Sequence, residues 1–122
     1  MKNIRLLPAA AISLWLTLSS LNCLPVHAQN LRAATSSSYL ERGNEWFAKG
    51  EYARAEADFT QAIKLQPQLA NTYALRGLVR LLQNRVDAAQ QDFDQCLTLD
   101  NGLRQSLERM IAEVKRQVAA AQ

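Results

Sequence analysis

Residues 39–67 read YLERGNEWFAKGEYARAEADFTQAIKLQP, and residues 73–101 read YALRGLVRLLQNRVDAAQQDFDQCLTLDN. When the second stretch is laid on the first at an offset of 34 residues, identical or similar residues recur throughout. The recurring pairs are Tyr39/Tyr73, Arg42/Arg76, Gly43/Gly77, Gly50/Asn84, Ala55/Ala89, Asp58/Asp92, Phe59/Phe93, Ala62/Cys96 and Leu65/Leu99. Self-similarity at one fixed period of this length indicates a repeat architecture.

Each repeat is predicted to form two helices. In the first repeat, Ser38 followed by Glu41 is typical of a helix start, and Gly50 is expected to end that helix. A second helix is predicted over roughly residues 53–66, because Pro67 cannot continue it. Gly43 lies inside the first helix, where it costs about 1 kcal/mol relative to Ala. We therefore expect the neighbouring helix to pack there too closely for a β-carbon.

These motifs resemble the tetratricopeptide repeat (TPR) family. The first copy is carried by Gly43, Asn44, Trp46, Gly50, Tyr52, Ala55, Phe59, Ala62 and Pro67, and the second by Gly77, Ala89, Phe93 and Leu99. The second copy departs from the pattern at Arg80, Val86 and Asn101, which stand where Trp46, Tyr52 and Pro67 stand in the first. The resemblance implies an all-α, right-handed stack of helical hairpins.

One more helical pattern follows the turn residues at 100–102. Apolar side chains recur there at three- and four-residue spacing, and charged side chains occupy the other face. This is typical of the terminal cap that repeat arrays need, and it brings the expected number of helices to about five. The expected boundaries are 1–28 for a signal peptide, 29–35 for a linker, 36–69 and 70–103 for the repeats, and 104–122 for the capping helix.

The first 28 residues have the three parts of an export signal. Lys2 and Arg5 form a basic start, an uncharged apolar run follows, and small side chains at Val26 and Ala28 suit a signal peptidase. Cleavage is expected after Ala28, which places the mature chain outside the cytoplasm, in a periplasm, a thylakoid lumen or the extracellular space. An uncleaved membrane anchor is the alternative.

The charge balance argues against nucleic-acid binding. The chain has fourteen Lys and Arg residues and eleven Asp and Glu residues, and two of the cations precede residue 29. The remaining twelve cations nearly balance the eleven acids, so the repeat region lacks the basic surface that a phosphate backbone requires.

No residue pattern points to catalysis, a metal or a cofactor. His27 is the chain's one histidine and lies in the expected leader, so Ser-His and Cys-His catalysis are excluded for the mature chain. Cys96 occupies the small-residue position of Ala62 and is expected to be buried and inert. Ligand spacings such as C-x-x-C are absent. We therefore expect no enzyme, no metal site and no cofactor.

Arg42 with Asp58, and Arg76 with Asp92, are predicted to form an ion pair within each repeat. Each Arg falls on the first helix of its repeat and each Asp on the second. Such pairs are worth up to about 1 kcal/mol each if exposed. An anion-binding role for the arginines is the alternative.

In proteins of this family the first helices line a groove that holds a segment of a partner. By resemblance, the groove-facing residues here are Leu40, Asn44, Phe47, Asn71, Ala74, Leu78 and Leu82. Leu81 has the same assignment, and for both Leu81 and Leu82 the alternative is burial in the core or against the cap. Asn44 matches one asparagine of the family's carboxylate clamp, but Leu40 stands where that clamp has a cation, which disfavours binding of a chaperone tail.

The functional expectation is a non-catalytic interaction module, an adaptor or assembly factor for a protein or peptide segment of an envelope or membrane complex. Two alternatives stay open. Because stable stacks usually contain three or more repeats, the chain could self-associate as a homodimer with a structural role. It could also be the regulatory subunit of an envelope enzyme.

Overall fold

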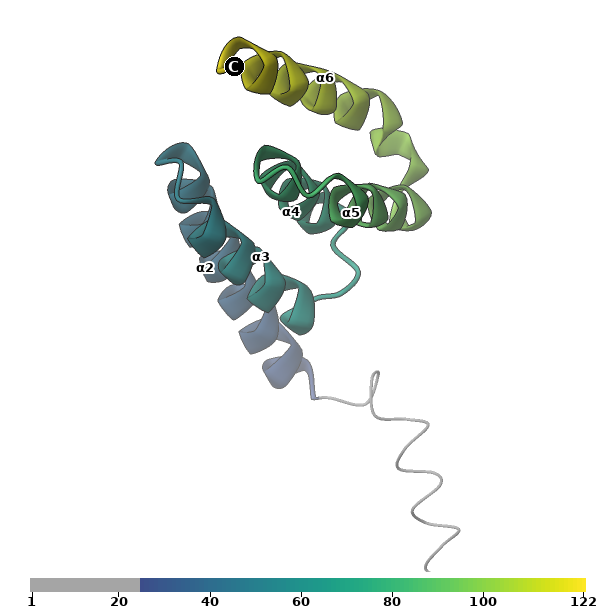
Figure 1. Ribbon diagram of the computed structural model, residues 1–122. Helices are drawn as coiled ribbons and strands as arrows, with labels where there is room; N and C mark the ends of the chain where they lie inside the picture. The colour runs from purple at the N-terminus through teal and green to yellow at the C-terminus, as the bar shows by residue number, and fades with distance from the viewer. Residues whose placement is uncertain (1–24) are drawn as a thin grey trace, which may run out of the picture. The chain divides into compact units, whose positions relative to one another are not determined.

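The computed structural model describes residues 25–122, which form α-helices joined by short turns (Figure 1). The helices are α2 (Val26–Ala48), α3 (Tyr52–Leu65), α4 (Ala70–Leu82), α5 (Val86–Leu99) and α6 (Arg104–Ala120), with a 3-10 turn, η1 (Asn101–Leu103), before α6. These five α-helices in the described part of the chain match the all-α expectation. Most of the expected signal peptide, residues 1–24, lies outside the described residues.

The chain divides into two compact units, Met1–Leu31 and Arg32–Gln122. Of the first unit, the structure describes residues 25–31, which include the beginning of α2. Both repeats lie in the second unit. None of the helices in residues 25–122 combines the length and the apolar character needed to cross a membrane.

Helix α2 begins twelve residues before Ser38, so the predicted start at Ser38 is wrong, and the expected linker at 29–35 is helical. The serines do not interrupt the helix because their hydroxyls find carbonyl partners. Ser38 Oγ donates to the oxygen of Ala34 one turn earlier, at 3.2 Å. Ser36 is fully buried and its Oγ donates to the oxygen of Ala62 in α3, at 3.3 Å.

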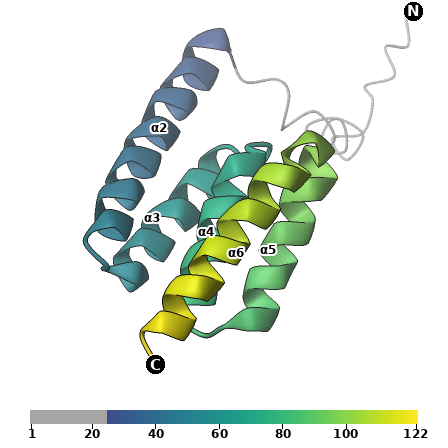
Figure 2. The same cartoon turned by 90° about the horizontal axis from the view of Figure 1, so that it is seen from above.

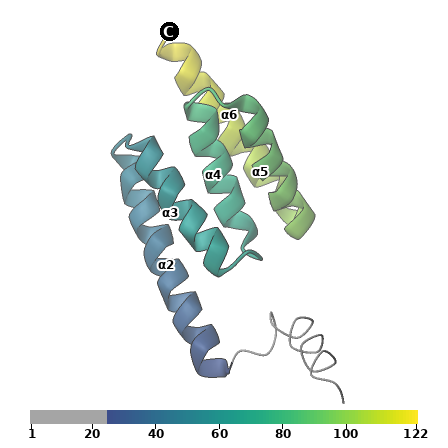
Figure 3. The same ribbon diagram turned by 60° about the horizontal axis from the view of Figure 1, so that its bottom comes forward.

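Each repeat is a hairpin of two helices, and the hairpins follow one another so that α3 lies between α2 and α4 (Figures 2 and 3). The turn inside each hairpin needs one residue with a left-handed backbone. Gly50 supplies it in the first repeat, with φ of 75°, and Asn84 supplies it in the second, with φ of 61°. The equivalence of Gly50 and Asn84 predicted from the repeat is therefore confirmed.

The two helices of each hairpin touch where a glycine faces a phenylalanine. A β-carbon added at Gly43 would lie 2.6 Å from Cε1 of Phe59, and one added at Gly77 would lie 2.4 Å from Cε1 of Phe93. Both distances are far below van der Waals contact, so the helices approach as closely as they do only because the glycines have no side chain. The close packing expected at Gly43 is confirmed.

Two apolar clusters form the core. The first contains Ala55, Phe59 and Val79, with Leu40, Trp46, Phe47, Tyr52 and Leu75 packed around it. The second contains Ala70, Ala74, Leu78, Leu81, Ala89, Phe93, Cys96, Leu107 and Val114. Val79 comes from α4 and enters the core of the first repeat, so it joins the two hairpins. Leu107 and Val114 come from α6, which covers one side of α4 as the expected cap.

We predict that Gly77→Ala lowers the free energy of unfolding by about 1–3 kcal/mol, because the new methyl group overpacks against Phe93. The loss should appear although Ala favours helices by about 1 kcal/mol. Urea denaturation followed by circular dichroism measures it. As a control, Gly77→Ala should cost less in a Phe93→Leu background, where the ring is gone. A stability unchanged by Gly77→Ala would contradict the close contact.

Candidate binding surface

Both predicted ion pairs are present in the structure. Arg42 donates from Nε to Oδ2 of Asp58 at 2.7 Å and from Nη2 to Oδ1 at 2.6 Å. Arg76 makes the equivalent pair of bonds to Asp92, at 3.0 and 2.7 Å. The carboxylates are buried rather than exposed, because the side chains of Asp58 and Asp92 are only 8% and 4% exposed.

Arg80 extends the second pair into a network that links the repeats. Its Nε donates to Oε1 of Glu56 in α3 at 2.7 Å, and its Nη1 donates to Oδ2 of Asp92 in α5 at 2.9 Å. Arg85 donates to the same Glu56 at 2.8 Å. Arg80 therefore replaces the ring of Trp46 at this repeat position with a polar bridge, which accounts for the main departure of the second repeat.

Arg42, Arg76 and Arg80 are structural side chains in this arrangement. Arg76 and Arg80 have side chains only 14% and 17% exposed, and their guanidinium groups already face carboxylates. Arg42 is more open, at 56%, but its hydrogen bonds to Asp58 raise the pKa of Arg42 and hold its charge at the helix interface. The ion-pair interpretation thus accounts for all three side chains without an external anion.

The residues predicted to line a groove fall into two groups. Asn44 and Asn71 are exposed, and Leu40, Phe47 and Leu82 are half-buried, so these five present surface. They come from α2 and α4, the first helices of the two hairpins. Phe47 also packs against Tyr52, with ring centroids 6.0 Å apart.

Ala74 and Leu78 are not groove residues, so this part of the prediction is wrong. Each is only 4% exposed and belongs to the second core cluster, together with Leu107 and Val114 of α6. Leu81 belongs to the same cluster, which decides its assignment in favour of the core. The physical reason is that α6 packs against the flank of α4 and covers side chains that would otherwise face solvent.

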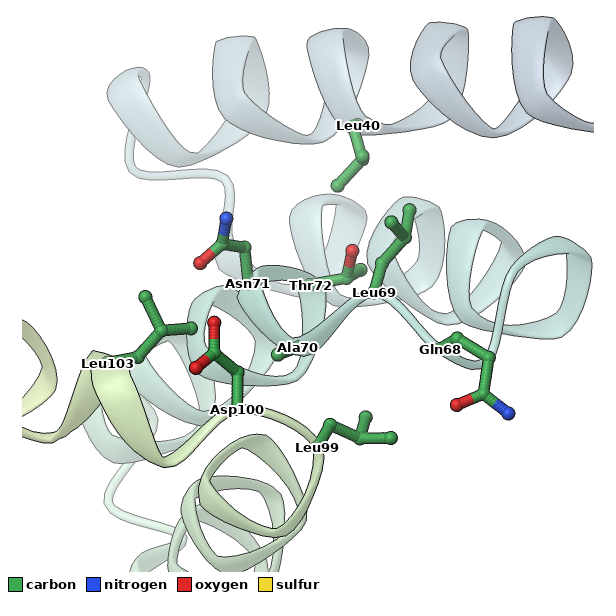
Figure 4. A pocket seen from close by; sticks show the side chains of 9 residues that line it. All are labelled: Leu40, Gln68, Leu69, Ala70, Asn71, Thr72, Leu99, Asp100 and Leu103. Carbon is green, nitrogen blue, oxygen red and sulfur yellow. The ribbon is translucent and has the colours of Figure 1, made fainter.

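A pocket of about 370 Å³ lies at the N-terminus of α4, between the two core clusters (Figure 4). Its lining comes from α2, the α3–α4 loop, the first turn of α4, and the α5–α6 connection. The lining residues are Leu40, Gln68, Leu69, Ala70, Asn71, Thr72, Leu99, Asp100 and Leu103. The pocket thus brings together two of the predicted groove residues, Leu40 and Asn71, and adds seven others.

The polar groups of this pocket are few and distinct. Asp100 is exposed and its Oδ1 accepts a hydrogen bond from the N–H of Gly102 at 2.9 Å. Leu69, the residue before α4, provides no side-chain cap for the helix. Thr72 is fully buried, and its Oγ1 has no hydrogen-bond partner among the described residues. A buried hydroxyl left unpaired costs about 1–3 kcal/mol.

Sequence reasoning missed Gln68, Leu69, Leu99, Asp100 and Leu103 as surface-forming residues. Gln68, Leu69 and Asp100 lie in connections between helices, where a helical pattern assigns no face, whereas Leu99 ends α5 and Leu103 ends η1. One feature of the sequence could have indicated them. Turn residues follow Pro67 and recur at residues 100–102, so the two turns fall at equivalent ends of successive hairpins.

A second depression, of about 340 Å³, lies near the C-terminal end of α6. Tyr52, Leu82, Gln117, Val118, Ala121 and Gln122 line it. It includes Leu82, the remaining predicted groove residue of α4. Hollows of the described surface therefore lie near both ends of α4.

The described residues contain no group of three or more His, Cys, Asp and Glu side chains placed to hold a metal ion. Cys96 is completely buried in the second core cluster. Burial, with a smaller contribution from the charge of Asp100, raises the pKa of the Cys96 thiol. A thiol in this environment stays protonated and is a poor nucleophile.

The fold defines the class of protein: a short array of antiparallel helix pairs that presents an extended surface. Residues 36–69 and 70–102 each match the family described as tetratricopeptide repeat. Together the two matches cover more than half of the chain, and the chain belongs to this family. Proteins built from such stacked repeats use their extended surfaces to bind other proteins.

Curated relatives share the repeats. The chain is 37% identical over 67 residues to the lipoprotein NlpI homolog of Haemophilus influenzae, which covers 55% of this chain and 21% of that protein. It is 31% identical over 88 residues to the outer dynein arm-docking complex subunit 4 of Xenopus laevis, covering 69% and 17%. It is 30% identical over 64 residues to the human mitochondrial import receptor subunit TOM70, covering 52% and 10%.

The chain therefore spans about a fifth or less of the length of these relatives. No solved structure matches it. The two family matches establish a protein–protein interaction fold.

We predict that Asp92→Ala is more destabilising than Asp58→Ala. Removing Asp92 leaves Arg76 largely buried without its carboxylate, which is expected to cost about 3–5 kcal/mol. Removing Asp58 leaves Arg42, which can still be hydrated, so the loss should be smaller. Chemical denaturation of the two variants provides the comparison. Equal losses would show that burial of the arginines does not matter.

Proposed function

We propose that this chain is an exported adaptor or assembly module that holds a segment of a protein partner from an envelope or membrane complex, and that it catalyses no reaction itself. The observation that carries the proposal is the exposed surface of a two-repeat TPR array, in which residues of both repeats line one pocket. Leu40 comes from the first repeat, and Asn71 comes from the second.

The names of the relatives support the binding part of this proposal. One is a lipoprotein, one is a subunit of a docking complex, and one is a subunit of an import receptor. In each of these proteins the matched segment is a small part of a larger chain. This chain contributes the repeats, and we propose that its partner is likewise a member of a larger assembly.

The exported location rests on the leader. Residues 1–28 combine a basic start, an uncharged apolar run and a Val26-His27-Ala28 site. Cleavage after Ala28 removes only the first three residues of α2, well before the first repeat at residue 36. Processing and folding of the repeats are therefore compatible.

The leader makes a direct prediction: the protein recovered from its native cells begins at Gln29. Intact-mass spectrometry of the purified protein, with sequencing of its first peptide, measures this. A protein that retains residues 1–28 and sediments with membranes would contradict cleavage and favour the uncleaved membrane anchor.

We predict that the tagged full-length chain, cross-linked in its native cells, retains one envelope or membrane complex, and that Asn44→Arg reduces the recovery severalfold. Asn44 is exposed on the surface formed by the first helices, so an Arg there adds bulk and charge without disturbing the core. Mass spectrometry identifies the retained proteins.

The matched control is Gln61→Arg, the same chemical change at an exposed position of α3. It should leave the recovery unchanged. Recovery of this chain alone would favour the self-associating alternative. Equal loss with both variants would show that the α2–α4 surface is not the one that binds.

A further inference from the structure

We propose that the pocket at the N-terminus of α4 binds an extended partner segment in which an aliphatic side chain stands next to a Lys or Arg, with the cation paired to Asp100. This inference rests on the proposed function, since it names the chemistry of the bound segment.

The apolar part of the pocket is suited to an aliphatic side chain. Four half-buried leucines converge on it from four separate segments of the chain, and Figure 4 shows them around one opening. They are Leu40, Leu69, Leu99 and Leu103. The volume of about 370 Å³ lies within the range of small binding pockets, roughly 300–1,000 Å³. Burial of an aliphatic group there removes apolar surface from water on both sides.

The charge of the pocket selects a cation. Asp100 is the one ionisable side chain among the nine lining residues. Within residues 25–122 no cation comes within ion-pair distance of it, and the nearby Arg104 donates to Asn101 instead, at 3.1 Å. In Figure 4 the carboxylate of Asp100 lies between Leu103 and Ala70, on the side toward Asn71. An approaching Lys or Arg therefore meets an uncompensated negative charge.

The N-terminus of α4 favours negative charge by itself, so the two effects must be weighed. A helix N-terminus is equivalent to roughly half a positive charge, whereas the carboxylate of Asp100 carries a full negative charge. The sum is negative, and the pocket is expected to repel an acidic side chain. The N–H of Thr72 already donates to the oxygen of Leu69 at 3.1 Å, so in the first turn the N–H groups of Ala70 and Asn71 are the ones available for neutral carbonyl oxygens of a bound backbone.

The amide group of Asn71 and the hydroxyl group of Thr72 complete the site. The side chain of Asn71 is exposed and can both donate to and accept from a peptide backbone. The buried hydroxyl of Thr72 lines the pocket and has no partner in the part of the chain that the structure describes. Figure 4 places Asn71 between Leu40 and Leu103, and Thr72 beside Leu69. A bound backbone is the kind of ligand that supplies both donors and acceptors at this point.

The test uses the ¹⁵N-labelled full-length chain and four capped peptides that are identical except at two central residues: Leu-Lys, Leu-Gln, Leu-Glu and Ser-Lys. We expect the Leu-Lys peptide to shift the amide signals of Asn71 and Gly102. It should bind about fivefold more tightly than Leu-Gln, the factor that corresponds to an ion pair of about 1 kcal/mol at a solvent-exposed site. Leu-Glu and Ser-Lys should bind more weakly than Leu-Gln and Leu-Lys respectively.

Asp100→Asn isolates the charge, because the amide oxygen of Asn can still accept the hydrogen bond from Gly102. This variant should lose the preference for Leu-Lys over Leu-Gln and keep the affinity for Leu-Gln. Asp94→Asn is the matched control, since it removes the same charge from an exposed position on α5 outside the pocket. It should keep the preference.

The remaining outcomes overturn the inference. Tighter binding of Leu-Glu would identify an anion site at the helix N-terminus. Shifts of Asn71 that change on dilution without peptide would assign the pocket to a second copy of this chain. If no peptide shifts the amide signals around the pocket, the pocket does not bind such a segment. The proposed function is tested separately, by the capture that depends on Asn44, so the two can fail independently.

Discussion

The contact between a glycine and a phenylalanine inside each hairpin is the constraint on which the rest of the structure depends. Phe59 and Phe93 fill the space that a β-carbon at Gly43 or Gly77 would need. The neighbouring residues follow from this contact, because Arg42 precedes Gly43 and Asp58 precedes Phe59 in the chain. When the helices meet at the glycine, the guanidinium group and the carboxylate are brought to hydrogen-bonding distance, and a single helix approach fixes both an apolar and a polar interaction.

The two repeats share the residues that join the helices within each hairpin. They differ in the residues on the outer face of the first helix, and this difference decides which face packs against a neighbouring hairpin. Helix α4 presents Leu75 and Val79 toward the first repeat, and these side chains are half-buried and buried. The equivalent positions of α2 carry Glu41 and Glu45, which are both exposed. Arg80 then ties α4 to α3 and α5 at once through Glu56 and Asp92. Apolar burial and a partly buried ion-pair network therefore act at the same junction between the hairpins.

The position of α6 decides which part of the surface can bind. Leu107 and Val114 cover Ala74 and Leu78, so the middle of α4 is core. What remains open lies at the two ends of α4, and the end nearer its N-terminus combines four leucines with a single carboxylate. A cap that stabilises the array thus also reduces the exposed apolar surface of α4, because it buries Ala74 and Leu78.

The sequence by itself determined the repeat, the two hairpins, the left-handed turn residues Gly50 and Asn84, the close contact at Gly43 and the two Arg–Asp pairs. All of these depend on short spacings within one repeat. The same spacings recur 34 residues later in the second repeat, so each is seen twice in the sequence. The early start of α2, the burial of Ala74 and Leu78, and the pocket around Asp100 were decided only by the tertiary structure. Each depends on segments far apart in the chain: Ser36 finds its partner on α3, α6 packs on α4, and two loops meet beside Leu40. A periodic pattern shows which face of a helix is apolar, but not which distant helix will cover it.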